Sequence, residues 1–438
     1  MKCGYVHFDD QVLHNTGWYA DTESSPKRFG ENETGELDNT HIWLSNMDFN
    51  IMKETNLLRN VRFRRTDFLG ETTNKIAERL GFFDLDKGAV IDFVSVMPFI
   101  FERIKSYAKF YAGMEELPQD SFRQGLRQIF IPQNDPIIDP PKQADYFREA
   151  DQYFTATIRD IFDKDEEKLP LYIPPDHECD FIFSQNYPKL NAGWNIVKEK
   201  SKRNLDFFRE IMDNQGCGLV KLRVLGFNPV FERFYNVGYS TNSKVGSRQW
   251  FTLEEAMLLA SEAEIVEVKD ILYTFDTFKP NTLKEIKKSI PEKFRYSISG
   301  MMFLHNLWSS LTARNINDYK NSNYRVNTIA PFVRFYDRYL CLSYAIKLSQ
   351  EDFKISGFGS GKIYISCNNV VSSQVLAGCR ETGLIPPILN VKDNEDCVEL
   401  KDCIKTLEVQ QYLWGHGKLD VLLNYDDYCA KEKTMNKS

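Results

Sequence analysis

The distribution of proline limits most strongly what this chain can fold into. Eight of the 17 prolines fall within residues 118–175. Proline has a fixed φ and no backbone N–H, so the prolines at 132–141 cannot continue a helix or enter a central strand. A second group at 170–175 follows a run of charged residues at 163–168. We therefore expect a domain boundary in this part of the chain.

A helix is predicted between the two proline groups. Asp139 can cap its N-terminus, and Pro140 suits the first helical position. Apolar residues follow at helical spacing, namely Tyr146, Ala150, Tyr153, Ile158 and Ile161. The interval is therefore expected to be a helical connector flanked by proline.

The chain as a whole is predicted to be an α+β multidomain protein. Its 438 residues are too many for one small core. We expect a mixed α+β N-terminal domain at 1–131, the proline-rich helical connector at 132–180, a central α+β domain at 181–350 and a C-terminal α/β unit at 351–438.

Local patterns predict the main elements of the central domain. Residues 194–214 show the spacing of an amphipathic helix, and residues 219–225 alternate as in a half-buried strand. Thr252, with Glu255 three residues later, predicts a capped helix over 252–260. A further helix, rich in aromatic residues, is expected at 334–348.

The C-terminal unit is predicted to run β-α-β-α-β. Strands are expected at 362–366, 387–391 and 419–423, and helices at 370–382 and 400–414. Gly383 and Gly415 would end the two helices. If the strands are parallel, a ligand crevice is expected near Cys367 and Asp393.

Composition bounds the class of protein. Lysine and arginine number 55 against 62 aspartate and glutamate, a net charge of -7, which argues against a protein that coats DNA. Aromatic residues make up 13% of the chain, so disorder throughout is excluded. The nine cysteines do not form a disulfide scaffold, and no apolar run suits a signal peptide or a membrane span. We expect a soluble, cytoplasmic protein with reduced thiols.

The trio Asp21-Thr22-Glu23 resembles the Asp-x-Glu element of proofreading-type exonucleases. Residues i and i+2 of a strand share a face, so two carboxylates there can hold a divalent metal against a phosphate. The resemblance implies Asp21 and Glu23 as catalytic residues and Mg²⁺ as cofactor, with Asp180 among the further ligands. The alternative interpretation is a solvated turn leading into residues 24–26.

The glycine-rich segment at 357–362 lies before a predicted strand. Its backbone amides could approach a phosphate, so Gly357, Gly359, Gly361 and Lys362 are candidate phosphate-binding residues. The segment is not a Walker loop, because a strand follows where a helix is needed. The favoured interpretation is a β-hairpin turn.

Two predicted strands rich in basic residues are the candidates for nucleic-acid binding. A strand over 59–65 would present Arg62 and Arg64 on one face, with Arg65 adjacent, and Lys221 and Arg223 repeat the arrangement. Arginine on a rigid strand suits contact with phosphate. Pairing of these cations with carboxylates is the alternative.

Other candidates are weaker. The run at 177–180 combines His, Glu, Cys and Asp but lacks a second pair of ligands, so no zinc site is predicted. A Cys367–His416 pair is a conceivable nucleophile and base, although buried structural thiols are favoured. Asp426 and Asp427 resemble the paired aspartates of template-dependent polymerases, but a surface position is favoured. No metal or cofactor is predicted, except Mg²⁺ in the nuclease alternative.

Two functions remain open from the sequence. The first is a non-enzymatic component of an intracellular macromolecular assembly, of the viral or mobile-element type, that has protein partners and contacts nucleic acid. The alternative is a divalent-metal-dependent enzyme, similar to a nuclease, that acts on nucleic acid or nucleotides through Asp21 and Glu23.

Overall fold

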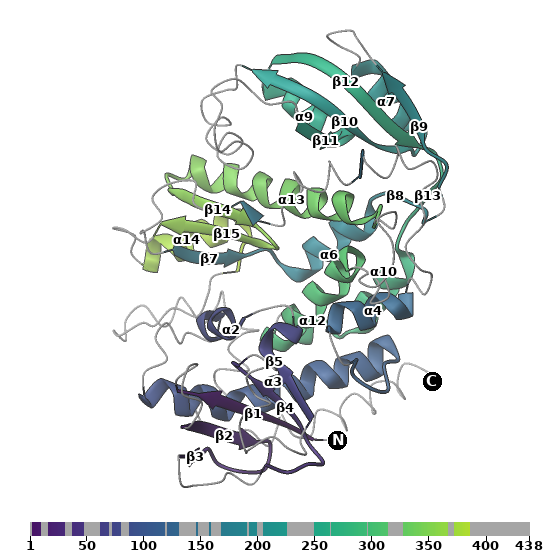
Figure 1. The fold of residues 1–438 in the computed structure, drawn as a ribbon. Coiled ribbons are helices and arrows are strands. Elements are labelled where there is room, and N and C mark those ends of the chain that lie inside the picture. Colours follow the sequence, from purple (N-terminus) through teal and green to yellow (C-terminus); the bar gives the residue numbers. More distant parts are fainter. Residues whose placement is uncertain are drawn as a thin grey trace. The chain divides into compact units, whose positions relative to one another are not determined.

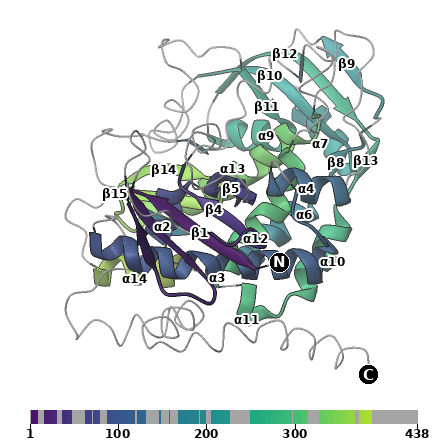
Figure 2. The same ribbon diagram turned by 60° about the horizontal axis from the view of Figure 1, so that its bottom comes forward.

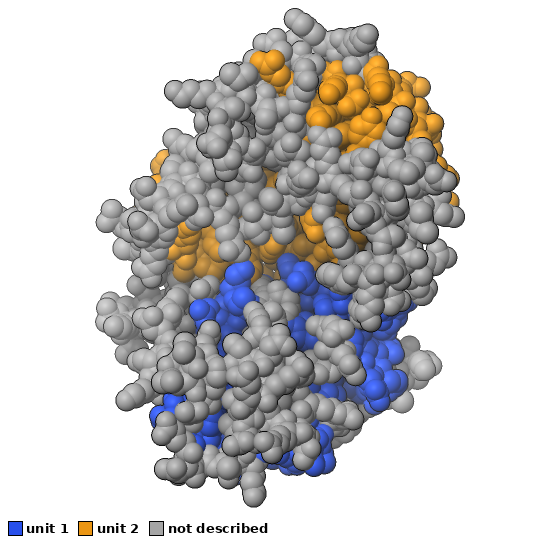
Figure 3. Space-filling view, viewed as in Figure 1, with its two compact units in different colours: residues 1–129, 288–307, 387–438 blue, residues 130–287, 308–386 orange. Residues whose placement is uncertain are grey.

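The fold is given by a computed structural model (Figure 1). It describes residues 2–9, 16–30, 37–47, 62–69, 72–79, 87–118, 121–130, 146–147, 157–158, 168–190, 192–198, 205–225, 249–262, 264–295, 297–313, 327–366 and 372–385. The chain divides into two compact units, which Figure 3 distinguishes by colour. Unit 1 comprises residues 1–129, 288–307 and 387–438, and unit 2 comprises residues 130–287 and 308–386.

Unit 1 contains a five-stranded sheet. Its strands, in chain order, are β1 (Cys3–Phe8), β2 (Gly17–Asp21), β3 (Lys27–Phe29), β4 (Ile42–Ser45) and β5 (Arg62–Arg65). The order across the sheet is β3-β2-β1-β4-β5, so β3 and β5 are its outer strands among the described residues. β1 pairs antiparallel with β2 and parallel with β4, and β5 pairs parallel with β4.

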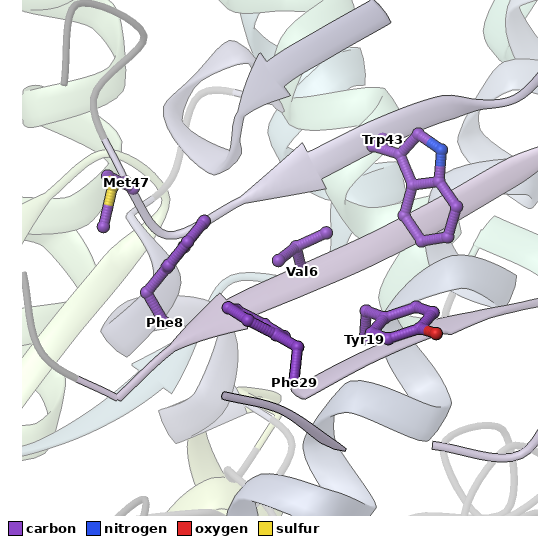
Figure 4. Close-up of a cluster of buried hydrophobic side chains, with 6 residues drawn as sticks. All are labelled: Val6, Phe8, Tyr19, Phe29, Trp43 and Met47. Carbon is purple, nitrogen blue, oxygen red and sulfur yellow. The ribbon is translucent and has the colours of Figure 1, made fainter. Parts of the chain in front are cut away.

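Side chains alternate across this sheet, so β1 packs in two directions. Tyr5 and His7 lie against Phe93 of helix α3 (Lys87–Ala112), which packs on β1 and β2 (Figure 2). The opposite face carries a cluster of buried side chains, shown in Figure 4: Val6, Phe8, Tyr19, Phe29, Trp43 and Met47. A Cβ at Gly4 would lie 2.4 Å from the ring of Trp43, so only glycine fits there.

The other described elements of unit 1 are helical. They are η2 (Thr66–Leu69), α2 (Thr73–Arg79), α4 (Phe122–Phe130), α11 (Glu292–Arg295) and α12 (Ile298–Ser309), which runs into unit 2. Phe122 lies between Phe68 and Phe303, with ring centroids 6.0 and 6.1 Å away. Residues distant in sequence therefore share one core.

Unit 2 contains an antiparallel sheet in the order β11-β10-β12-β9. Its strands are β9 (Asn195–Lys198), β10 (Cys217–Leu225), β11 (Gln249–Thr252) and β12 (Glu264–Thr274), and helices α7 (Leu205–Asp213) and α9 (Leu253–Glu262) pack on it. The strand expected at 219–225 and the helix capped by Thr252 are confirmed. The helix expected at 194–214 is wrong for its first part, because residues 195–198 pair with β12 as a strand.

A second antiparallel sheet of unit 2 has the order β6-β14-β15-β7. Its strands are β6 (Thr157–Ile158), β7 (Lys168–Tyr172), β14 (Ile355–Gly359) and β15 (Lys362–Ser366). Pro170 lies in β7, an outer strand of this sheet among the described residues, where its missing N–H costs least. Helix α13 (Ala330–Gln350) packs on β14 and β15, and it confirms the helix expected at 334–348 (Figure 1).

The remaining elements of unit 2 are short, apart from three helices. They are α6 (Pro175–Ser184), β8 (Tyr187–Pro188), β13 (Thr277–Phe278), α10 (Asn281–Ser289), η3 (Ser310–Thr312) and α14 (Ser372–Thr382). Gly383 follows α14 with φ +76°, as predicted for the end of that helix.

The mixed α+β, multidomain class is confirmed, and the end of the expected connector helix is corrected. Ile158 belongs to strand β6 rather than to the connector helix, because Thr157 and Ile158 pair with Gly359 and Phe358. The strand expected at 362–366 is present as β15, and it pairs antiparallel with its two described neighbours, β14 and β7. The later elements expected at 387–423, and with them Cys367 and Asp393, lie outside the described residues.

The division at 131, 180 and 350 stays a prediction. Among the described helices, none is long and apolar enough to cross a membrane.

Candidate functional site

Three consecutive residues of α13 form hydrogen bonds with three different parts of unit 2. Tyr336 donates its hydroxyl to Glu254 Oε1 at 2.8 Å, and Arg338 donates Nη2 to both carboxylate oxygens of Glu255 at 3.0 and 3.1 Å. Between them, Asp337 accepts hydrogen bonds from the turn that joins β14 to β15. We refer to Tyr336, Asp337 and Arg338 as the α13 triplet.

The turn held by Asp337 is the glycine-rich segment. The N–H of Ser360 donates to Asp337 Oδ2 at 2.7 Å, and the N–H of Gly361 donates to Oδ1 at 2.8 Å. Ser360 and Gly361 have φ values of +56° and +70°, as two-residue hairpin turns of type I′ require. The favoured interpretation of a β-hairpin is therefore correct, and the anion next to these two amides is the protein's own carboxylate.

The other candidate phosphate-binding residues lie in the same hairpin. Gly357 and Gly359 are buried in β14. Lys362 is also buried, with its Nζ 5.6 Å from the centre of the Tyr172 ring. Phosphate binding by Gly357, Gly359, Gly361 and Lys362 stays a prediction.

Burial changes the acidity of the α13 triplet and its neighbours. Desolvation raises the pKa of Asp337 from its ordinary 3.8 to about 6, although the two turn amides and Arg338 favour the carboxylate. Desolvation also raises the pKa of Glu254, which accepts the hydrogen bond from Tyr336. The nearby thiol of Cys341, whose Sγ lies 3.5 Å from Asp337 Oδ1, has a strongly raised pKa for the same reason. The site therefore contains carboxyl groups that take up protons more readily than exposed ones.

Helix α6 carries the run at 177–180. His177 is exposed and shares a hydrogen bond with the hydroxyl of Tyr344. Asp180 binds Nζ of the buried Lys287 at 2.8 Å, and Asp176 binds the same nitrogen at 3.2 Å. Burial raises the pKa of the Cys179 thiol well above its ordinary value. Within the described ranges, no group of three or more His, Cys, Asp and Glu side chains could hold a metal ion.

Asp21 and Glu23 lie at the end of β2 in unit 1. Asp21 Oδ1 accepts the backbone N–H groups of Glu23 and Ser24, both at 2.7 Å, which closes the turn. Glu23 is exposed and pairs with Lys2. Both carboxylates are therefore engaged by groups of the protein itself, and their catalytic role stays a prediction.

The basic strands lie in different units. Arg62, Arg64 and Arg65 form β5 with Phe63, at the outer side of the unit 1 sheet. Lys221 and Arg223 lie on β10 in unit 2, where Asp270 and Glu267 are their partners in register on β12. Lys221 also lies over the ring of Trp250, 5.8 Å from its centre. Both register partners of Lys221 and Arg223 are acidic residues, whereas β5 is an outer strand of its sheet among the described residues.

Sequence reasoning missed the α13 triplet. The available signal was a pair of charged residues, Asp337 and Arg338, inside a helix otherwise rich in buried apolar residues. Buried charges require partners, so such a pair indicates polar groups facing it from other elements. Asp426, Asp427 and His416 lie outside the described residues.

Comparison with known proteins gives matches to solved structures alone. No protein-family model and no curated protein matches the chain. Phi29 DNA polymerase in its ternary complex with primer-template DNA and incoming nucleotides is 9% identical, over 85% of this chain and 82% of that chain, with a TM-score of 0.43. The complex of that polymerase with single-stranded DNA is also 9% identical, over 85% and 81% of the two chains, with a TM-score of 0.46. At such values the similarity identifies no functional residue, so function has to follow from this chain's own residues.

Proposed function

We propose that the protein is a non-enzymatic component of a cytoplasmic macromolecular assembly and that it contacts nucleic acid through β5. The observation that carries the nucleic-acid contact is the composition and position of this strand. Three of its four residues are arginines, and it is an outer strand of the described sheet. Arginine recognises phosphate through a planar fork of donors, so an edge of this kind suits a nucleic-acid backbone.

The proposal that the protein is not an enzyme is supported by the hydrogen bonds that the candidate catalytic and phosphate-binding groups make within the protein. The Asp21 carboxylate closes a turn, and the amides of Ser360 and Gly361 bind Asp337. These groups stabilise the protein's own turns. Protein partners belong to the proposal as an expectation from the sequence.

Nucleic-acid binding is tested with the full chain and fluorescently labelled oligonucleotides, single- and double-stranded, over a range of salt concentrations. The test variant is Arg62→Ser with Arg64→Ser. The matched control is Lys27→Ser with Arg28→Ser, which removes the same charge from two exposed residues of β3, the outer strand at the opposite end of the strand order. We expect the β5 variant to bind at least about tenfold more weakly and its salt slope to fall by about 2, because two phosphate contacts are lost.

Equal losses in the two variants would mean that net charge, and not β5, determines binding. Unchanged binding in the β5 variant would overturn the assignment of this strand. The nuclease alternative is tested in the same preparations: Mg²⁺-dependent cleavage by the natural chain that is lost in Asp21→Ala with Glu23→Ala would overturn the non-enzymatic part. The native mass of the complex from its own source, with its 260/280 nm absorbance ratio, tests for partners.

A further inference from the structure

Phe275, which follows β12 in unit 2, is the most exposed of the large apolar side chains that the structure describes. It is 51% exposed, against 42% for Ile129 and 37% for Ile196. An isolated exposed apolar side chain is ordinary on a protein surface. Phe275 differs because its ring belongs to a cluster of aromatic side chains and lies on a turn that hydrogen bonds hold in place.

The cluster is a row of three rings. The ring centroid of Phe275 lies 5.7 Å from that of Tyr273 on β12, which lies 5.5 Å from that of Phe207 on α7, and both contacts are edge-to-face. Phe207 and Tyr273 are partly exposed. We refer to Phe207, Tyr273 and Phe275 as the α7 aromatic cluster. Aromatic side chains of this kind supply much of the binding energy in protein interfaces.

The backbone around Phe275 is fixed by contacts with the end of α7. The N–H of Thr277 donates to the carbonyl oxygen of Phe275 at 3.0 Å, and Thr277 Oγ1 donates to the carbonyl oxygen of Gln215 at 2.9 Å. A Cβ at Gly216 would lie 2.9 Å from Phe275 Cδ1, so the ring packs closely on that glycine. The exposed ring is therefore held in one place before a partner binds, which lowers the entropic cost of binding.

Exposed acids border the cluster on α7. Asp206, Glu210 and Asp213 lie at positions i, i+4 and i+7 of this helix, and Glu210 is three residues from Phe207, so its side chain lies beside the rings. Arg209 pairs with Asp206 at 3.1 Å. The last turn of α7, which the structure describes in full, holds no basic residue. Acids at the negative end of the helix dipole are unfavourable, and a cation that approaches from outside relieves this.

We propose that the α7 aromatic cluster is a docking surface for a basic segment of a partner protein. An apolar side chain of that segment covers Phe275, and its lysine or arginine residues pair with the acids of α7. The inference rests on the proposed function in one respect, namely the expectation of protein partners. Beyond Phe275, the chain adds one acid and one cation, Asp276 and Lys189, which leave the acidic sign unchanged. Acids beside the rings repel phosphate, so the surface suits a basic protein segment and not a nucleic acid.

A fluorescently labelled helical peptide of leucine and lysine is the probe, and its leucine and glutamate counterpart is the control probe. Fluorescence anisotropy with the full chain measures both affinities. We expect Phe275→Ser to bind the lysine peptide at least about tenfold more weakly, because an aromatic anchor is lost. Ile196→Ser is the matched control, since it also removes an exposed apolar side chain. Ile196 pairs in register with Leu272, so it lies on the opposite face of the sheet from Tyr273, and its variant should bind as the natural chain does.

A charge variant tests the second half of the surface. Glu210→Lys with Asp213→Lys keeps the three rings and should weaken binding of the lysine peptide at least about tenfold, while the glutamate peptide binds more tightly. Because both residues are exposed, this variant decides the proposal if Phe275→Ser does not fold. Equal affinity of Phe275→Ser and Ile196→Ser for the lysine peptide, or unchanged affinity in the charge variant, would overturn the proposal.

Oligonucleotide binding in the same preparations separates this inference from the proposed function. Phe275→Ser should bind the labelled oligonucleotides as the natural chain does, because β5 is intact. Loss of oligonucleotide binding in Phe275→Ser would make the cluster a nucleic-acid surface and overturn the docking of a basic segment. Peptide binding that does not depend on Phe275, with oligonucleotide binding that still depends on β5, would overturn this inference alone and leave the proposed function standing.

Discussion

Arg338 of α13 donates two hydrogen bonds from its Nη2 to the carboxylate of Glu255 of α9, and both side chains are almost completely buried. Each group is removed from water, and each satisfies part of the other's hydrogen-bonding capacity. Such a pair contributes little net stability, but loss of one partner leaves a buried charge without compensation. The pair therefore fixes where α9 meets α13 within unit 2.

The first prediction concerns this ion pair. We expect Arg338→Met or Glu255→Leu alone to lower the free energy of unfolding by about 3–5 kcal/mol, since each leaves one charge buried. The double variant should recover most of that loss, because it replaces both charges by apolar groups. Urea unfolding of the four proteins gives the coupling energy. Additive losses would show that the two residues act independently.

The second prediction concerns the Asn46 side chain, which pairs with the backbone of Phe8 as a residue of a neighbouring strand would. Its Oδ1 accepts the N–H of Phe8 and its Nδ2 donates to the carbonyl oxygen of Phe8, both at 3.0 Å. Asn46→Ala should cost about 1–3 kcal/mol, because two backbone groups at the end of β1 lose their partner. Urea unfolding measures the difference, and an unaffected Asn46→Ala would contradict the prediction.

The fold was predictable from the sequence where the information is local. Thr252 caps α9 by accepting the N–H of Glu255 at 3.3 Å, within one helical turn. Ile158 could not be assigned in this way, because it pairs with Phe358, 200 residues later in the numbering. Helical spacing and a short edge strand look alike until the partner strand is known.

For the candidate site too, local features were predictable from the sequence and long-range contacts were not. The turn at Gly361 was predictable from its glycines, whereas its partner Asp337 was not, because the hydrogen bond depends on how α13 packs on β14. The glycine pattern indicated amides exposed to an anion. It could not show that the anion belongs to the same chain.

The third prediction is a pH dependence that originates at His7. Burial lowers the pKa of His7 from 6.5 to about 4 in the folded protein. Well above pH 6.5 the ring is neutral in both states and contributes nothing to the pH dependence. As the pH falls from 6.5 toward 4, the unfolded chain takes up a proton that the folded chain does not bind. The free energy of unfolding should therefore fall by up to about 3 kcal/mol over this window.

His7→Gln should remove this component, which urea unfolding at a series of pH values would measure. Tyr5→Phe is the matched control, because it deletes the hydroxyl 3.3 Å from His7 Nδ1 and keeps the ring buried. It should retain the pH slope. A slope that is the same in His7→Gln as in the natural chain would show that other groups produce it.

The last prediction separates two costs at glycines with positive φ. Gly361 and Gly383 have nearly the same φ, +70° and +76°, so replacing either by alanine incurs a similar conformational penalty of about 1–2 kcal/mol. Their surroundings differ: a Cβ at Gly361 would lie 2.2 Å from Glu178 Oε1, whereas nothing lies within 4 Å of a Cβ at Gly383. Gly361→Ala should therefore lower the free energy of unfolding by about 1–3 kcal/mol more than Gly383→Ala, because the buried Glu178 side chain has to move.

Urea unfolding of Gly361→Ala, Gly383→Ala and Gly361→Ala combined with Glu178→Ala tests the cause. If the contact is responsible, Gly361→Ala should cost less in the Glu178→Ala background than in the natural chain, and an equal cost in both backgrounds would assign the loss to the turn itself.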